Sequence, residues 1–226
     1  MKNINYFYSR LEVLGKKNDR DDLGEREIKT FMTLITGEKS SSLGVNKINP
    51  FLGKNISDIG CGDQYLKKSF ERYGGNYLGI DINTCDFNKD RLPLNDKSQD
   101  IVVFLAVIEH LRNPNNILSE IKRVLRTDGF MILSSPDINA VRNHFWNDPT
   151  HVHPYNPKSI RHLLNIFNFK EIKVIPNYRC MHPLFYNESS IIFALSRFLP
   201  FRGTSKLPVP SFLKGKCSGF FAIAKN

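Results

Sequence analysis

A glycine-rich turn lies between two apolar stretches near residue 60, and an acid follows it at a set distance. Gly60 and Gly62 come after the apolar residues 56–59, and Asp81 ends the next apolar run, 21 positions after Gly60. Glycine lets the backbone approach a ligand closely, and a helix opening after the turn directs free N–H groups toward it. An acid ending the second strand can accept ribose hydroxyls. The spacing predicts a nucleotide-cofactor site.

Two side chains beside this turn narrow the class of cofactor. Nicotinamide and flavin sites use a third glycine that lets helix and strand pack closely, and Tyr65 occupies that position here. Asp58, just before the first glycine, adds negative charge, which repels a pyrophosphate and suits a cationic ligand. A nucleoside without phosphates therefore fits the turn better than a dinucleotide.

Further motifs follow in order, and with them the chain resembles the class I S-adenosylmethionine-dependent methyltransferases over residues 54–176. The resemblance implies S-adenosyl-L-methionine as cofactor. It also implies an α/β fold, a Rossmann-like seven-stranded, mostly parallel sheet with helices on both faces and an antiparallel last strand. Gln64 and Thr127-Asp128 depart from the family's pattern without removing a group that the cofactor needs. The motifs are residues 58–62, Asp81, 86–88, 92–94, 100–103, 109–111, 123–130 and 134–137.

The resemblance also assigns roles within the cofactor site. The backbone of the glycine turn would line the methionine part, and Asp81 would accept from the ribose. Ile82 would pack on the adenine and Asp86 would accept from its amino group, unless Asp86 is only a turn or cap residue. Leu105 and Ala106 would lie below the sulfonium. The implied cofactor-binding residues are Asp58, Gly60, Cys61, Gly62, Asp81, Ile82, Asp86, Phe87, Leu105 and Ala106.

Histidines occur in two places that a parallel sheet brings to its carboxyl edge. His110 follows the apolar run 101–108, and His151 and His153 lie in the polar segment 148–155. This edge faces the ligand crevice, and imidazole exchanges protons near neutral pH. We expect His151 or His153 to be the catalytic base and His110 to close the pocket. The alternative is that these rings only bond the loop backbone, and no metal is expected.

The elements that position these residues alternate between helix and strand. Apolar spacing predicts helices over 22–36 and 65–73, and Asn-Pro pairs predict further helices beginning at residues 113–114 and 156–157. Continuous apolar runs over 101–108 and 130–133 predict buried parallel strands, and residues 219–224 the last strand. We expect an N-terminal helical segment and linker over 1–53 and a methyltransferase domain over 54–226, with an insert at 180–215.

Charge and cysteine content limit the partners and the compartment. The net charge is +10, from 32 basic and 22 acidic residues, and residues 189–226 hold six basic residues and no acid. Such a field attracts phosphates of RNA, lipid headgroups or sugar-phosphate carriers, although it can also be only a solvated surface. Four cysteines without metal spacing predict free thiols in a cytoplasmic protein.

The methyl acceptor is predicted from two features that are less specific than the cofactor motifs. Segment 148–155 resembles that of methyltransferases of polysaccharide and glycolipid biosynthesis. Residues 191–201 are apolar and aromatic with basic neighbours, which is typical of peripheral membrane contact or of a lid. We therefore expect O-methylation of a saccharide, a lipid-linked or glycolipid acceptor, or a small molecule. Two alternatives remain. One is an RNA methyltransferase, although the sequence contains no recognisable RNA-binding module, and the other is a non-catalytic cofactor binder.

Overall fold

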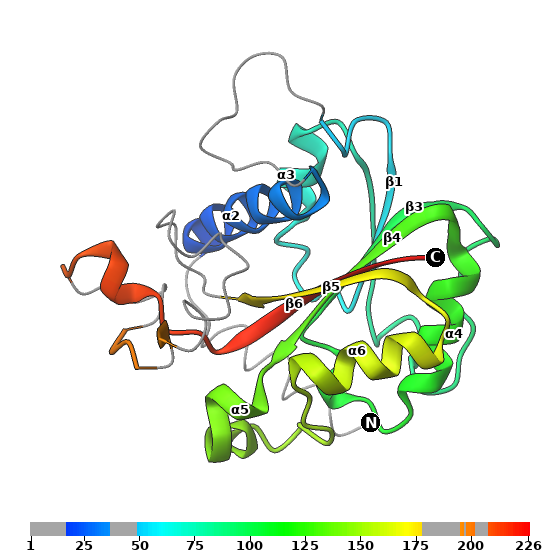
Figure 1. Cartoon of the computed structure of the whole chain (residues 1–226). Helices are drawn as coiled ribbons and strands as arrows, with labels where there is room; N and C mark the ends of the chain where they lie inside the picture. The colour runs from blue at the N-terminus through cyan, green and yellow to red at the C-terminus, as the bar shows by residue number, and fades with distance from the viewer. Residues whose placement is uncertain (1–16, 37–48, 178–194, 197, 202–207) are drawn as a thin grey trace.

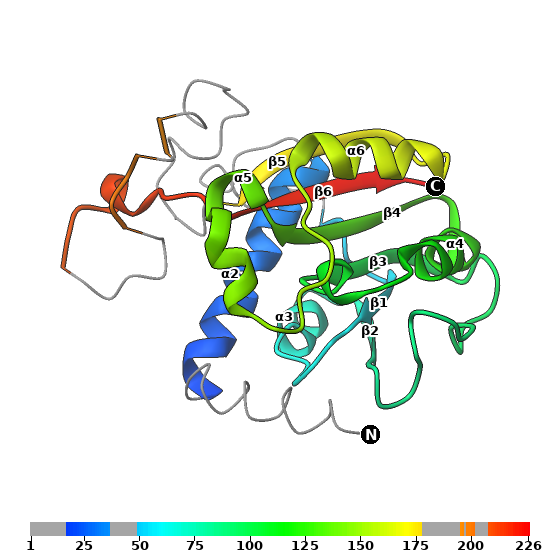
Figure 2. The same cartoon turned by 90° about the horizontal axis from the view of Figure 1, so that it is seen from below.

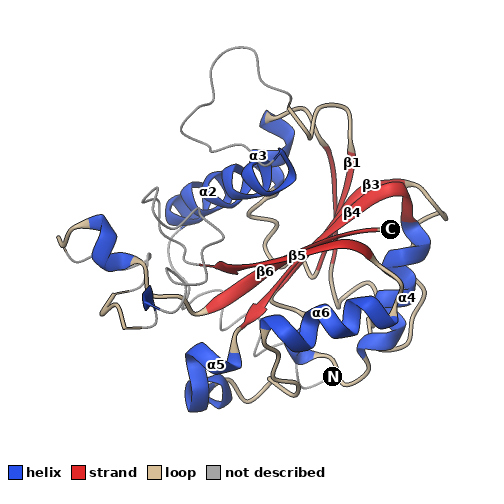
Figure 3. Ribbon diagram, in the orientation of Figure 1, coloured by secondary structure: helices blue, strands red, loops and turns tan. Residues whose placement is uncertain are grey.

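The computed structural model describes residues 17–36, 49–177, 195–196, 198–201 and 208–226. Its centre is one β-sheet with helices on both faces (Figure 1). The strands are β1 (Asn55–Ile59), β2 (Asn76–Ile80), β3 (Gln99–Leu105), β4 (Leu125–Pro136), β5 (Lys170–Asn177) and β6 (Gly219–Lys225). Figure 3 shows these strands as one twisted layer.

The sheet has the order β2-β1-β3-β4-β6-β5. Strands β2, β1, β3 and β4 run parallel, and β6 is antiparallel to both of its neighbours. The Rossmann-like fold class and the antiparallel last strand are therefore confirmed. The strand count differs from the expected seven, because the described residues form six. Only the 18 residues 81–98 join β2 to β3, and they form an irregular loop in place of a further helix and strand.

Helices close the two faces of the sheet separately, as Figures 1 and 2 show. The first face packs against α2 (Lys17–Thr36) and α3 (Lys67–Arg72), whose buried aromatics include Phe31 and Phe70. The second packs against α4 (Pro114–Val124) and α6 (Pro157–Ile166) through residues such as Ile121 and Leu164. Shorter elements are η2 (Ile108–His110), α5 (Ile138–Val141), η3 (Arg142–Asn147) and η5 (Ser211–Lys214).

Local signals place the starts of α4 and α6 correctly. The Asn113 side chain accepts from the Asn115 N–H at 3.2 Å, and Asn156 accepts from Lys158 and Ser159 in a capping box. Each cap satisfies N–H groups that lack a partner within the first turn. The predicted helix over 22–36 is confirmed and begins earlier, at Lys17.

Two predicted boundaries are wrong. Strand β3 ends at Leu105 rather than at residue 108, because Ala106 has a left-handed φ of 52° and the chain then enters η2. Helix α3 begins only at Lys67, after a series of turns from Gly62. The first turn of α3 therefore lies away from the glycine turn, whose own N–H groups donate within the protein: those of Gly60 and Cys61 to the Ile80 carbonyl and that of Gly62 to Asp81.

Several predictions fall partly outside the described residues. These are the first 16 residues of the N-terminal segment, the linker over 37–48, and most of the insert over 180–215. Cys61, Cys85 and Cys217 are free thiols, and Cys180 lies outside the described residues. Within the described part of the chain, no helix has both the length and the apolarity needed to cross a bilayer.

Candidate active site

The carboxyl ends of β1, β2, β3 and β4 meet at one edge of the sheet, because these strands are parallel. The predicted cofactor residues Gly60, Asp81 and Ala106 each directly follow one of these ends. The Gly60 N–H donates to the Ile80 carbonyl at 2.7 Å, which links the first two ends. Residues far apart in the sequence are thus brought together where ligands bind in open α/β sheets.

The glycine turn has the geometry expected of a close approach to a ligand. Gly60 has φ +79°, and a Cβ there would lie 2.2 Å from Val107 Cγ2, so no side chain fits. Gly62 has φ +52°, and a Cβ there would meet no atom within 4 Å. Space is therefore open above Gly62, while Gly60 must remain glycine to let η2 pack against the turn.

Asp81 lies beside that open space. Its Oδ2 accepts from the Gly62 N–H at 2.6 Å and its Oδ1 from the Ile82 N–H at 2.7 Å. The Ile82 side chain is 44% exposed, which leaves an apolar surface for a flat ring. These groups fit S-adenosylmethionine: the partly exposed carboxylate suits the ribose, the exposed apolar side chain suits the adenine, and the open glycine backbone suits the methionine part.

Other predicted cofactor residues lie deeper. The Phe87 side chain is buried in the core beneath α4, so only its backbone can meet a ligand. Cys61 is also buried, and burial together with Asp58 raises the pKa of its thiol to about 12, so the thiol stays protonated. Leu105 is half-buried and Ala106 exposed at the end of β3.

Asp58 lies behind the turn and accepts a hydrogen bond from the Tyr77 hydroxyl at 2.7 Å. Burial raises the pKa of this carboxyl to about 7 against the opposing effect of the Tyr77 hydrogen bond, and the negative Glu27 and Asp81 raise it further. Asp58 is only 3% exposed, so the structure does not place its carboxyl where it could contact a ligand directly.

This raised pKa makes the stability of the protein dependent on pH. Between pH 3.8 and about pH 7, Asp58 is ionised in the unfolded chain but still protonated in the folded protein. The free energy of unfolding therefore falls as the pH rises through this range. We expect Asp58→Asn to raise the free energy of unfolding at pH 8 by roughly 2–4 kcal/mol. Urea unfolding at pH 8 and pH 5 measures this effect, and the gain should fall by more than half at pH 5.

The matched control is Asp63→Asn, which removes an exposed carboxylate of the same turn. We expect this substitution to change stability little at either pH. Equal gains for Asp58→Asn at pH 8 and pH 5 would contradict the assignment of a pKa of about 7 to Asp58.

A second cluster forms where η2 meets the loop after η3. The Val152 and His153 N–H groups both donate to the Glu109 carbonyl, at 2.8 and 3.1 Å. These bonds bring the predicted bases together, and the rings of His110 and His151 lie 4.8 Å apart.

The hydrogen bonds of this cluster assign the proton on His110. The Thr150 hydroxyl donates to Asp148 Oδ1 at 2.6 Å, since a carboxylate only accepts. The same hydroxyl lies 2.8 Å from His110 Nδ1, so Nδ1 must be the donor there. His110 therefore carries a proton on Nδ1, and in the neutral ring Nε2 is the acceptor. An acid, a hydroxyl and an imidazole in series resemble the base and orienting group of known catalytic sites.

The other two predicted bases bond the backbone, as the alternative interpretation of the loop histidines held. His151 Nδ1 donates to the Phe145 carbonyl at 2.6 Å, and its Nε2 lies 3.8 Å from Asp148 Oδ2. His153 Nδ1 donates to the Leu111 carbonyl at 2.8 Å. Only His151 shares the acid with His110.

The sequence reasoning did not assign Thr150 and Asp148 as partners of His110, because 40 positions separate Thr150 from the ring it contacts. The polar character of segment 148–155 was the available signal. Glu109, His110 and His151 also bring potential metal ligands within 4.8 Å of one another. The expectation that no metal is needed stays a prediction.

A family model described as a methyltransferase domain matches residues 39–174, more than half of the chain. The chain therefore belongs to this family, within the class I S-adenosylmethionine-dependent methyltransferases, and S-adenosylmethionine is the cofactor of the class.

Individual relatives agree with the family. The chain is similar to the ubiquinone biosynthesis O-methyltransferase of Glaesserella parasuis, with 29% identity over 114 residues, which cover 40% of this chain and 48% of that protein. The chain thus spans about half the length of the curated relatives it matches. Its fold is similar to that of a SAM-dependent methyltransferase from Archaeoglobus fulgidus, with TM-score 0.56, 19% identity, and coverage of 77% of this chain and 86% of the other.

Proposed function

We propose that this protein transfers a methyl group from S-adenosylmethionine to a hydroxyl of a saccharide, a glycolipid or another small acceptor. The observation that carries the proposal is the series Asp148, Thr150 and His110, which lies beside the strand ends that hold the cofactor residues. The O-methyltransferase activity in the name of the Glaesserella parasuis relative supports a hydroxyl acceptor.

The cofactor supplies a methyl group already activated by the positive sulfonium. The remaining tasks of the protein are to bind the acceptor in line and to remove its proton. We assign proton removal to His110 Nε2. The Nδ1–H of the same ring donates to Thr150, which keeps the ring in the tautomer that accepts, and Asp148 stabilises the positive charge that develops. His151, in ring contact with His110, would line the acceptor side.

The acceptor class can be tested by labelling. The protein is incubated with methyl-labelled S-adenosylmethionine and a fractionated cell extract, and each fraction is counted. Label in the glycan, lipid-linked or small-molecule fraction supports the proposal, and label confined to a ribonuclease-sensitive fraction would replace it with an RNA methyltransferase. Cofactor binding without label in any fraction would favour a non-catalytic binder.

We further propose that the apolar segment around residue 198 contacts a membrane that carries a lipid-linked acceptor. Residues 198–201 and η5 project together from one end of the sheet (Figures 1 and 2). They are joined by hydrogen bonds between Phe201 and both Leu213 and Lys216. Leu195 is 62% exposed, Phe198 86% and Phe212 48%, and exposed apolar side chains beside basic residues suit anionic headgroups.

Vesicle binding tests this contact. We expect the double substitution Leu195→Ser and Phe198→Ser to weaken cosedimentation with anionic phospholipid vesicles by about tenfold or more, since each apolar side chain loses its burial in the bilayer. The matched control is Ile166→Ser, which removes an equally exposed apolar side chain from α6. Equal binding of the double variant and the wild type would contradict the proposed contact.

A further inference from the structure

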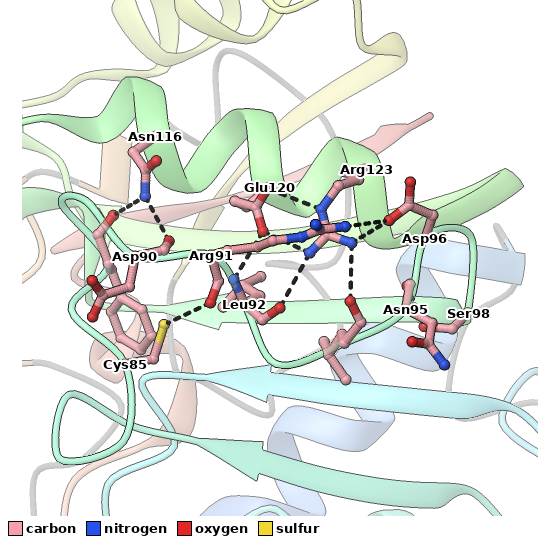
Figure 4. A network of polar contacts seen from close by, with 12 residues as sticks. Cys85, Asp90, Arg91, Leu92, Asn95, Asp96, Ser98, Asn116, Glu120 and Arg123 are labelled. Carbon is pink, nitrogen blue, oxygen red and sulfur yellow. Dashed lines mark hydrogen bonds and ion pairs between the residues drawn. The ribbon is translucent and has the colours of Figure 1, made fainter.

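The loop 81–98 carries the adenine side of the cofactor site and takes the place of a missing helix and strand. Without a neighbouring strand, its backbone groups need other partners. Side chains of α4 supply several of them, as Figure 4 shows. Side chains of α4 therefore satisfy backbone groups of this loop that a neighbouring strand would satisfy in a sheet.

Arg123 makes the largest set of these contacts. Its guanidinium donates to the carbonyls of Leu92 at 3.2 Å and Leu94 at 2.9 Å, and to Asp96 Oδ1 at 2.5 Å (Figure 4). It also forms two bonds with Glu120, at 2.9 and 2.6 Å. The planar guanidinium can meet all these acceptors at once because its donors form a rigid fork.

Glu120 and Asn116 complete the attachment. Glu120 Oε2 accepts from the Leu92 N–H at 2.8 Å, so the same carboxylate joins Arg123 and the loop. Asn116 donates to the carbonyls of Phe87 at 3.2 Å and Asp90 at 3.0 Å (Figure 4). These contacts fix the chain on both sides of the turn that follows Asp86.

Burial distinguishes this network from an ordinary surface ion pair. The side chains of Arg123 and Glu120 are 17% and 15% exposed, whereas those of Arg91 and Asp96 are 69% and 63% exposed. The hydrogen bond from Arg123 lowers the pKa of the Glu120 carboxyl, and the same pair raises the pKa of Arg123. Exposed pairs contribute little, but a shielded pair that also binds backbone groups can fix a loop.

The turn held in this way presents Asp86. Its Oδ1 accepts from the Asn88 backbone N–H at 3.0 Å and from the Asn88 amide at 3.2 Å. The backbone N–H of Asn88 lowers the pKa of Asp86, so the carboxylate is ionised and oriented. A hydrogen bond to a bound ligand from such a group is lost if the turn shifts by about 1 Å.

We propose that Asn116, Glu120 and Arg123 are positioning residues that set the affinity for S-adenosylmethionine by fixing the turn that presents Asp86. This inference rests on the proposed role of Asp86 toward the adenine. It predicts that loosening the α4 contacts weakens cofactor binding while leaving the chemistry of a saturated enzyme unchanged.

The test combines calorimetry with S-adenosylhomocysteine and hydrogen exchange of the cofactor-free protein. We expect Arg123→Met to raise the Kd for S-adenosylhomocysteine by about tenfold or more, to speed exchange of the amides of residues 86–94, and to leave kcat within about twofold. Arg123→Lys should recover only part of the affinity. Asn116→Ala, which changes no charge, should show a smaller effect of the same kind.

The matched control is Arg91→Met, which removes an arginine of the loop itself that pairs with the exposed Asp96. We expect its Kd to equal that of the wild type. Faster exchange in Arg123→Met and Asn116→Ala without a change in Kd would overturn the positioning role. Failure of the wild type to bind S-adenosylhomocysteine would instead refute the cofactor site, so the two failures are distinguishable.

Discussion

Replacing His110 with asparagine should lower kcat by about 10²–10⁴-fold, the usual contribution of a general base. The structure gives the reason, because His110 Nδ1 donates to Thr150 and the ring therefore presents Nε2 as the acceptor. Asparagine preserves a polar side chain but cannot take the proton of the acceptor hydroxyl. The cofactor should still bind, because the predicted cofactor residues lie on the glycine turn, on loop 81–98 and at the end of β3, and His110 is not among them. Initial rates and calorimetric titration of the same preparation measure both quantities.

The other histidines provide the comparison. His151→Asn should reduce kcat less than His110→Asn, because Nε2 of His151 faces Asp148 Oδ2 at 3.8 Å and the ring's role is to line the acceptor side. His153→Asn should have a smaller effect again, and the exposed His162 on α6 serves as the neutral control. A larger loss in His151→Asn or His153→Asn than in His110→Asn would move the base to that ring, as the sequence favoured.

The second large effect is expected at Asp81. Asp81→Asn should raise the Kd for S-adenosylhomocysteine by about 10²-fold or more, since two hydroxyls lose a charged acceptor and each such bond contributes roughly 1.5–3 kcal/mol. The asparagine oxygen can still accept from Gly62 or Ile82, so the turn should remain folded. Calorimetry gives the affinity, and thermal unfolding checks the fold.

Asp128→Asn is the matched control for this substitution. Asp128 is an exposed aspartate in β4, near its start, and the same isosteric change is made there. We expect an unchanged Kd. Equal affinities of Asp81→Asn and the wild type would mean that the ribose lies elsewhere and that the two hydrogen bonds of Asp81 serve the turn alone.

Local features of this fold could be predicted because their causes are local. The Asn-Pro pairs at 113–114 and 156–157 each contain a cap and a residue suited to the first helical position, and both helices begin there. The glycine turn and Asp81 were predicted from spacing alone, and the parallel strands bring them together.

Features that depend on distant residues could not be predicted in the same way. The resemblance to a family implied seven strands, yet the 18 residues between β2 and β3 form a loop, and its partners on α4 lie about 30 positions away. The expectation that His151 or His153 is the base rested on residue type and place in the loop. The proton on His110 Nδ1 is instead fixed by contacts with Thr150 and, through it, Asp148, which no local sequence pattern contains.

The most direct test compares methyl transfer by the wild type and His110→Asn. Both are incubated with methyl-labelled S-adenosylmethionine and the glycan and lipid fractions of a cell extract, after calorimetry has shown equal cofactor binding. We expect the wild type to label an acceptor and His110→Asn to lose at least about 99% of that rate. Equal labelling by the two proteins would contradict the assignment of the base. No labelling by a wild type that binds the cofactor would contradict the proposed activity.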